Sequence, residues 1–118
     1  MDVKGWINLG DEYKPVELLV VSRDLMDLIA KEKGVYTPDD YTEGMWVHDE
    51  NAIYLIDKPI HASPEFILLH EIVHCIDDLT DMHEDDENRV DAKAQLLLAF
   101  IKYNQDLIQT LIKKELYN

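Results

Sequence analysis

The strongest constraint on the fold of this chain is the segment 70–74, whose sequence HEIVH places polar groups in an otherwise apolar stretch. A Ser-Pro pair at 63–64 suits the N-cap and the first position of a helix, so the sequence predicts a helix over 64–79. Four residues of helix turn through about 400°, so His70 and His74 lie one above the other. The two imidazoles therefore share one side of this helix.

Histidines at this spacing can bind one metal ion. Glu71 lies close enough to approach a water on that ion without displacing an imidazole. Because the neighbouring residues are apolar, the motif is carried toward the core, where unpaired polar groups are costly and metal binding removes the cost. The sequence thus indicates a metal site on His70 and His74. Two hydrogen-bonded histidines without a metal remain the open alternative.

A third ligand is predicted on the next helix, which we expect over about 86–103. Glu87 and Asp91 are four residues apart, and the same stripe continues through Ala94 and Leu98. Zinc held by two histidines and one carboxylate, with a position open to water, is a catalytic pattern. We predict Glu87 as the third ligand and Asp91 as the acceptor for the outward N–H of a ligating histidine. Both could instead be solvated acids at a helix start.

Three residues near the motif offer alternatives. His83 could replace Glu87 as the third ligand if its loop folds inward. Asp77 follows His74 by three residues and could orient that histidine, bind the metal, or be an ordinary carboxylate at a helix end. Thr80 occupies the position at which the metzincin class has its third histidine, which disfavours that class.

Other reactive side chains fit ordinary roles better. Cys75 is the single cysteine, so it cannot form an internal disulfide, and we expect it to be a small buried residue. His48 and His61 lack ligand spacing. Tyr54 and Tyr103 could donate to an oxyanion, but each is expected in the core.

The rest of the chain predicts one α+β domain over residues 1–118. Three β-rich runs predict strands over 16–21, 45–48 and 52–56. The last two flank a turn and predict a hairpin. Ser22 and Gly34 suit the two ends of a further helix, and Asn104 suits a left-handed break before a last helix over about 106–117. Residues 1–14 predict a loosely structured arm. We therefore expect a small three-stranded sheet, an active-site helix and two further C-terminal helices.

The charge balance limits the partners. Twenty-five acidic and eleven basic residues in 118 give a net charge of -14. Such a chain repels phosphate backbones and anionic lipids, so we expect no nucleic-acid and no membrane partner. The first twenty residues lack the apolar core of a secretory signal, and no apolar run is long enough to span a membrane. We expect a cytoplasmic protein.

The two motifs resemble those of a known class of enzymes. His70-Glu71-x-x-His74 followed by Glu87-x-x-Val90-Asp91-x-x-Ala94 resembles the gluzincin metallopeptidases, in which Val90 is usually alanine. The segment 52–117 further resembles the very small zincin-like metallopeptidases of phages and prophages, related in layout to the ImmA/IrrE type.

The resemblance implies a minimal zincin-like fold with Zn²⁺ bound by His70, His74 and Glu87, and with Glu71 as the general base. It also implies that the strand over 52–56 is an edge strand that borders the cleft. Only twelve residues separate His74 from Glu87.

Together the motifs predict a zinc-dependent metalloprotease that hydrolyses an intracellular protein or peptide. A catalytically weak or inactive zincin-fold module of phage origin, which binds a partner protein, is the alternative.

Overall fold

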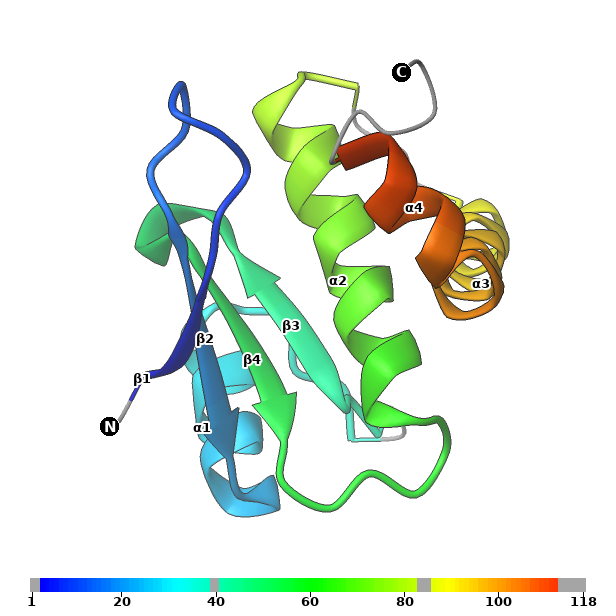
Figure 1. The fold of residues 1–118 in the computed structure, drawn as a ribbon. Helices are drawn as coiled ribbons and strands as arrows, with labels where there is room; N and C mark the ends of the chain where they lie inside the picture. Colours follow the sequence, from blue (N-terminus) through cyan, green and yellow to red (C-terminus); the bar gives the residue numbers. More distant parts are fainter. Residues whose placement is uncertain (1–2, 39–40, 83–85, 113–118) are drawn as a thin grey trace.

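The computed structural model describes residues 3–38, 41–82 and 86–112 and has a mixed α+β architecture (Figure 1). The elements follow in the order β1 (Val3–Ile7), β2 (Val16–Val21), α1 (Arg23–Glu32), β3 (Gly44–Val47), the 3₁₀ turn η1 (His48–Glu50), β4 (Ala52–Ile56), α2 (Pro64–Leu79), α3 (Glu87–Tyr103) and α4 (Gln105–Ile112). The predicted α+β class is confirmed. None of the described helices combines the length and the apolar composition needed to cross a membrane.

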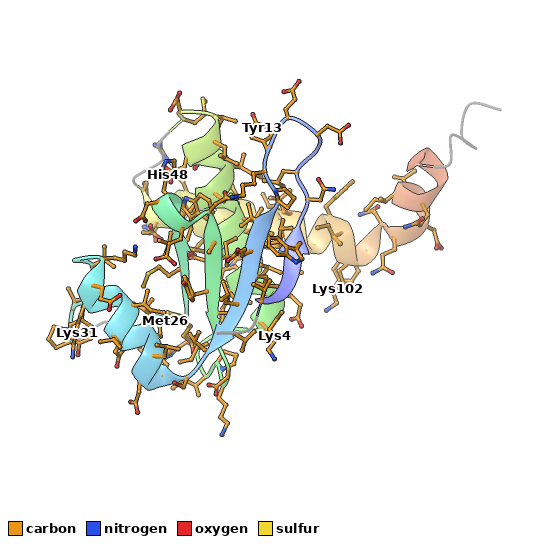
Figure 2. The ribbon with its side chains drawn as sticks, turned by 90° about the vertical axis from the view of Figure 1, so that its left-hand side faces the viewer. Lys4, Tyr13, Met26, Lys31, His48 and Lys102 are labelled. Carbon is orange, nitrogen blue, oxygen red and sulfur yellow. The ribbon has the colours of Figure 1, made fainter. Side chains whose placement is uncertain are left out.

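The strands form one sheet in the order β1-β2-β4-β3. The central strands β2 and β4 are parallel, and each outer strand is antiparallel to its neighbour. Helix α1 packs on one face of the sheet, where Met26 is fully buried (Figure 2). Helix α2 packs on the other face, and α3 contacts the side of α2 that faces away from the sheet (Figure 1). Helix α2 thus lies between the sheet and α3, with Ile67, Glu71, Val73 and Cys75 buried.

Both predicted serine caps are present. The Ser22 Oγ accepts a hydrogen bond from the Leu25 backbone N–H at 3.2 Å, and the Ser63 Oγ accepts one from Phe66 at 3.2 Å. Gly34 follows α1 with a positive φ of 73°, as expected of a helix terminator. These local signals set the ends of α1 and the start of α2.

The prediction for Asn104 was wrong in its conformation. Asn104 separates α3 from α4, but its φ is −131° rather than positive. Its side-chain amide donates to the Phe100 carbonyl oxygen, and its own carbonyl oxygen accepts from the Ile108 N–H. Asn104 therefore joins the two helices through hydrogen bonds and needs no left-handed turn.

Within the described residues the sheet has four strands, so the prediction of three was wrong. The supposed arm contains β1, which pairs with β2 through a register shift between Val3 and Gly5. The strand is mostly exposed, with Trp6 61% accessible, so the alternation that would reveal a strand is weak. Ile7 nevertheless packs against the buried cluster of Val16, Ile53 and Cys75.

The prediction that the strand over 52–56 is an edge strand was also wrong. β4 is central because it pairs with β2 on one side and with β3 on the other. The predicted hairpin of β3 and β4 alone would leave one side of β4 unpaired, but β2 pairs with that side in parallel. The edge strand beside α2 is therefore β3.

Tyr54 of β4 makes the stability of the fold depend on pH in the alkaline range. Its hydroxyl donates to the Glu50 carboxylate, and burial together with this bond raises the pKa of Tyr54 to about 12 from 10.0. The folded state thus holds a proton that the unfolded chain loses first. Stability present below pH 10 is lost as the pH rises toward 12, by about 1–2 kcal/mol.

We expect Tyr54→Phe to flatten the fall in the free energy of unfolding between pH 10 and 12, measured by urea titration at several pH values. Tyr103→Phe serves as the control, because Tyr103 of α3 is 76% exposed; the expectation that it lies in the core was wrong. Equal slopes for wild type and Tyr54→Phe would contradict this assignment.

Candidate metal centre

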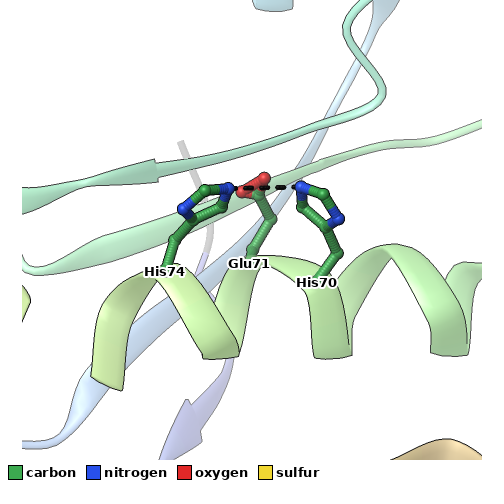
Figure 3. Close-up of side chains that lie close together, drawn as sticks. All are labelled: His70, Glu71 and His74. Carbon is green, nitrogen blue, oxygen red and sulfur yellow. Dashed lines mark hydrogen bonds between the residues drawn. The ribbon is translucent and has the colours of Figure 1, made fainter. Parts of the chain in front are cut away.

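Helix α2 presents both histidines and Glu71 on the side that faces β3 (Figure 3). The Nε2 atoms of His70 and His74 are 3.2 Å apart. One ring nitrogen of each histidine and one Glu71 carboxylate oxygen lie within 4.8 Å of one another. The helical spacing therefore produces a convergent cluster, as the sequence predicts.

Glu87, the first residue of α3, brings its carboxylate to the same point. Its Oε2 lies 3.0 Å from the His70 Nε2 and its Oε1 lies 3.1 Å from the His74 Nε2. The Glu87 side chain is 63% exposed, whereas the two histidines are 18% and 25% exposed. Glu87 thus covers the histidine pair from the solvent side.

Asp91 contacts the outer nitrogen of His70 and orients its ring. Its Oδ1 lies 2.7 Å from the His70 Nδ1, so the ring donates its Nδ1–H to the carboxylate and directs Nε2 at the cluster. A neutral His70 then presents a lone pair to the Glu87 oxygen 3.0 Å away. Two acceptors at this distance require a cation between them, either a proton or a metal ion.

These donors lie close enough together to hold one metal ion, and their spacing does not single out zinc. Tetrahedral ligands at about 2.0–2.1 Å from zinc are about 3.3–3.4 Å apart. The two Nε2 atoms are 3.2 Å apart, and each lies 3.0–3.1 Å from a different Glu87 oxygen. The residues that could hold a metal are therefore His70 and His74 together with the carboxylate of Glu71 or Glu87, and Asp91 lies behind His70.

Glu71 is buried, with 7% of its surface accessible. Burial raises the pKa of its carboxyl, and the charge of Glu87 adds to the increase, while His70, His74 and the Trp46 backbone oppose it. A carboxylate that holds a proton more readily than usual is better matched to proton transfer near neutral pH. The position and burial of Glu71 suit a general base.

The other sequence candidates do not join the cluster. Among the described residues no hydrogen bond connects Asp77 to His74, and the Asp77 Oδ2 is buried without a partner there. Cys75 is buried, and burial raises the pKa of its thiol to about 11, which disfavours the thiolate that binds metals. Thr80 caps α2. His83 lies outside the described residues.

Gly44 is a site residue that the sequence analysis missed. A Cβ there would lie 2.6 Å from the Ile67 Cγ2 and 3.0 Å from the Glu71 Cγ. Only glycine lets the start of β3 approach α2 this closely. A single glycine before an apolar run was the available signal, and it does not say what the strand approaches.

The backbone of β3 borders the cluster. The Glu43 carbonyl oxygen accepts a hydrogen bond from Ile56, so the alternation of an antiparallel pair directs the N–H and C=O groups of Gly44 and Trp46 away from β4. These groups lie on the free edge of the described sheet, and the Trp46 N–H lowers the pKa of Glu71. β3 therefore offers hydrogen-bonding groups beside the candidate metal centre.

The buried Glu43 carboxylate fixes the residue that precedes β3 to the loop after β4. Glu43 is 8% exposed and accepts hydrogen bonds from the Ile60 N–H at 2.6 Å and the His61 N–H at 3.0 Å. The same region includes Tyr41, which packs edge-on against the His61 ring and lines a cavity of about 470 Å³ over the cluster. Sequence reasoning missed both Glu43 and Tyr41 because their partners are distant in the chain.

Compared with known proteins, the chain matches no family model, no curated protein and no solved structure. The resemblance to gluzincins rests on the residues of the two motifs, and membership of that class stays a prediction.

We expect Gly44→Ala to lower the free energy of unfolding by about 1–3 kcal/mol, because the new methyl overlaps a buried β-branched side chain. Combining it with Ile67→Ala should recover part of that loss relative to the sum of the single variants. Gly5→Ala is the matched control, since its Cβ would meet Leu18 at an ordinary 4.0 Å. Equal effects of the two glycine substitutions in denaturant titrations would contradict the steric role of Gly44.

Zinc affinity tests the cluster directly. We expect Asp91→Ala to weaken zinc binding by about 10–100-fold, because His70 loses the acceptor that orients it. Glu87→Ala should weaken it further. Isothermal titration with zinc measures both, and Glu65→Gln, at the start of α2, is the control. Wild-type affinity in Glu87→Ala would exclude that residue as a ligand.

Proposed function

We propose that the protein is a zinc-dependent metalloprotease of the gluzincin type, built on a minimal zincin-like fold. One observation carries the proposal. The two imidazoles of His70 and His74 and the carboxylate of Glu87 converge at 3.0–3.2 Å beside the buried Glu71. Two histidines, one carboxylate and an adjacent acid form the donor set of a hydrolytic zinc site.

Zinc supplies Lewis acidity at such a site, which lowers the pKa of water and polarises a peptide carbonyl. His70, His74 and Glu87 would hold the ion, and Asp91 would keep the His70 Nε2 free of its proton. The Glu71 carboxylate would accept the proton of the attacking water and later deliver it to the leaving amine. Burial of Glu71 supports this role, because it raises the affinity of the carboxylate for that proton.

The substrate would lie extended along β3. The outward backbone groups of Gly44 and the outward C=O of Trp46 can pair with a peptide strand, which is β-augmentation of a sheet edge. The central strand β4 has no free edge and cannot serve. The peptide would then cross the cavity over His70 and His74.

The test is Glu71→Gln. We expect this variant to bind zinc as the wild type does and to lose about 10²–10⁴-fold in the rate of peptide hydrolysis, because an amide cannot accept the proton. A peptide library incubated with the zinc-loaded protein and analysed by mass spectrometry gives the rates. Glu65→Gln should retain activity.

Undiminished cleavage by Glu71→Gln would remove Glu71 from the role of base. A wild-type protein that holds stoichiometric zinc and cleaves nothing in the library would replace the protease with the binding module.

A further inference from the structure

A second cavity, of about 350 Å³, lies beside the first along β3. Both cavities are lined by Thr42, Gly44, Glu71, His74 and Glu87. The first extends toward Tyr41 at the start of β3, and the second extends toward Trp46 and Asp78. A peptide laid along β3 would therefore pass through both cavities and over the candidate metal centre.

The second cavity combines apolar walls with one oriented carboxylate. Val35 and Trp46 supply the apolar surface, whereas the Met45 side chain is buried in the core on the α1 face. The Trp46 indole Nε1–H donates to the Asp78 Oδ2, which fixes the carboxylate next to the ring. The Asp78 side chain is 30% exposed, and a carboxylate can accept several hydrogen bonds at once. Asp78 can thus receive a further donor from a ligand.

A lysine or arginine side chain matches this surface. Its methylene groups would contact Val35 and Trp46, while its cation would reach Asp78 and the face of the indole. The His48 ring already lies 3.6 Å from the Asp78 Oδ2, and its side chain is 71% exposed, so a ligand cation would share the carboxylate with it. The net charge of -14 also attracts basic peptides.

We infer that this second cavity is a specificity pocket for a lysine or arginine side chain of the substrate, with Asp78 as its specificity-determining residue. The inference rests on the proposed function, because it treats β3 as the substrate strand. An antiparallel peptide, the more stable arrangement, runs opposite to β3, so its N-terminal part lies at the Trp46 end. The basic residue therefore lies on the N-terminal side of the bond that is cleaved.

Peptide binding to the Glu71→Gln protein loaded with zinc tests the pocket without hydrolysis. The probes are fluorescein-labelled neutral peptides that differ at one position, which is lysine, arginine, norleucine or glutamate. We expect the lysine and arginine peptides to bind about tenfold or more tightly than the norleucine peptide in fluorescence anisotropy. The preference should shrink as salt rises.

Four variants in the Glu71→Gln background locate the preference. Asp78→Asn should reduce it to within about twofold, and Asp78→Glu should retain most of it. Val35→Lys places a cation at the exposed rim of the pocket and should abolish the preference while leaving the Trp46–Asp78 hydrogen bond intact. Asp24→Asn, on α1 at the other face of the sheet, removes the same charge and should change nothing.

Equal affinity for lysine and norleucine peptides before any change at Asp78 would overturn the inference. So would an equal loss of preference in Asp24→Asn, because net charge rather than the pocket would then select the peptide. Cleavage by the wild type on the N-terminal side of basic residues would overturn the assigned direction. A retained lysine preference in a protein that never cleaves would reject the protease and leave the pocket standing, whereas cleavage without preference would do the reverse.

Discussion

The close approach of α2 to the edge strand β3 is the contact on which the candidate site depends. Gly44 has no side chain, so the Cγ of Glu71 and the Cγ2 of Ile67 occupy the space where a Cβ would lie. This contact buries the Glu71 carboxyl beneath the strand and places the outward backbone of β3 beside the two histidines. Any larger residue would separate Glu71 from the strand.

The charged groups divide into two layers with different physical roles. Glu71 is buried, and loss of water raises its affinity for a proton. Glu87 and Asp91 come from α3 and remain partly exposed, so solvent lowers the cost of placing two carboxylates near one another. Glu87 also lies in the first turn of α3, where the helix dipole stabilises a negative charge. Glu87 can therefore be both an acid that the helix dipole stabilises and a candidate metal ligand.

Much of the local structure could be predicted from sequence because its causes are local. Ser63 and Pro64 set the start of α2, and the spacing of His70 and His74 makes their rings converge on one side of it. The distance between Glu87 and Asp91 likewise predicts that both face the same neighbour. The strand β1 was missed because an exposed edge strand with a register shift carries no clear alternation.

The sequence by itself determined which side chains could share a metal, since helical periodicity alone aligns the two histidines and aligns Glu87 with Asp91. Only the tertiary structure decided which strand borders them. The parallel pairing of β2 with β4 leaves β3 at the edge, and strand order depends on contacts between residues far apart in the chain, which no local pattern encodes. The pairing of Trp46 with Asp78, 32 residues apart, has the same origin.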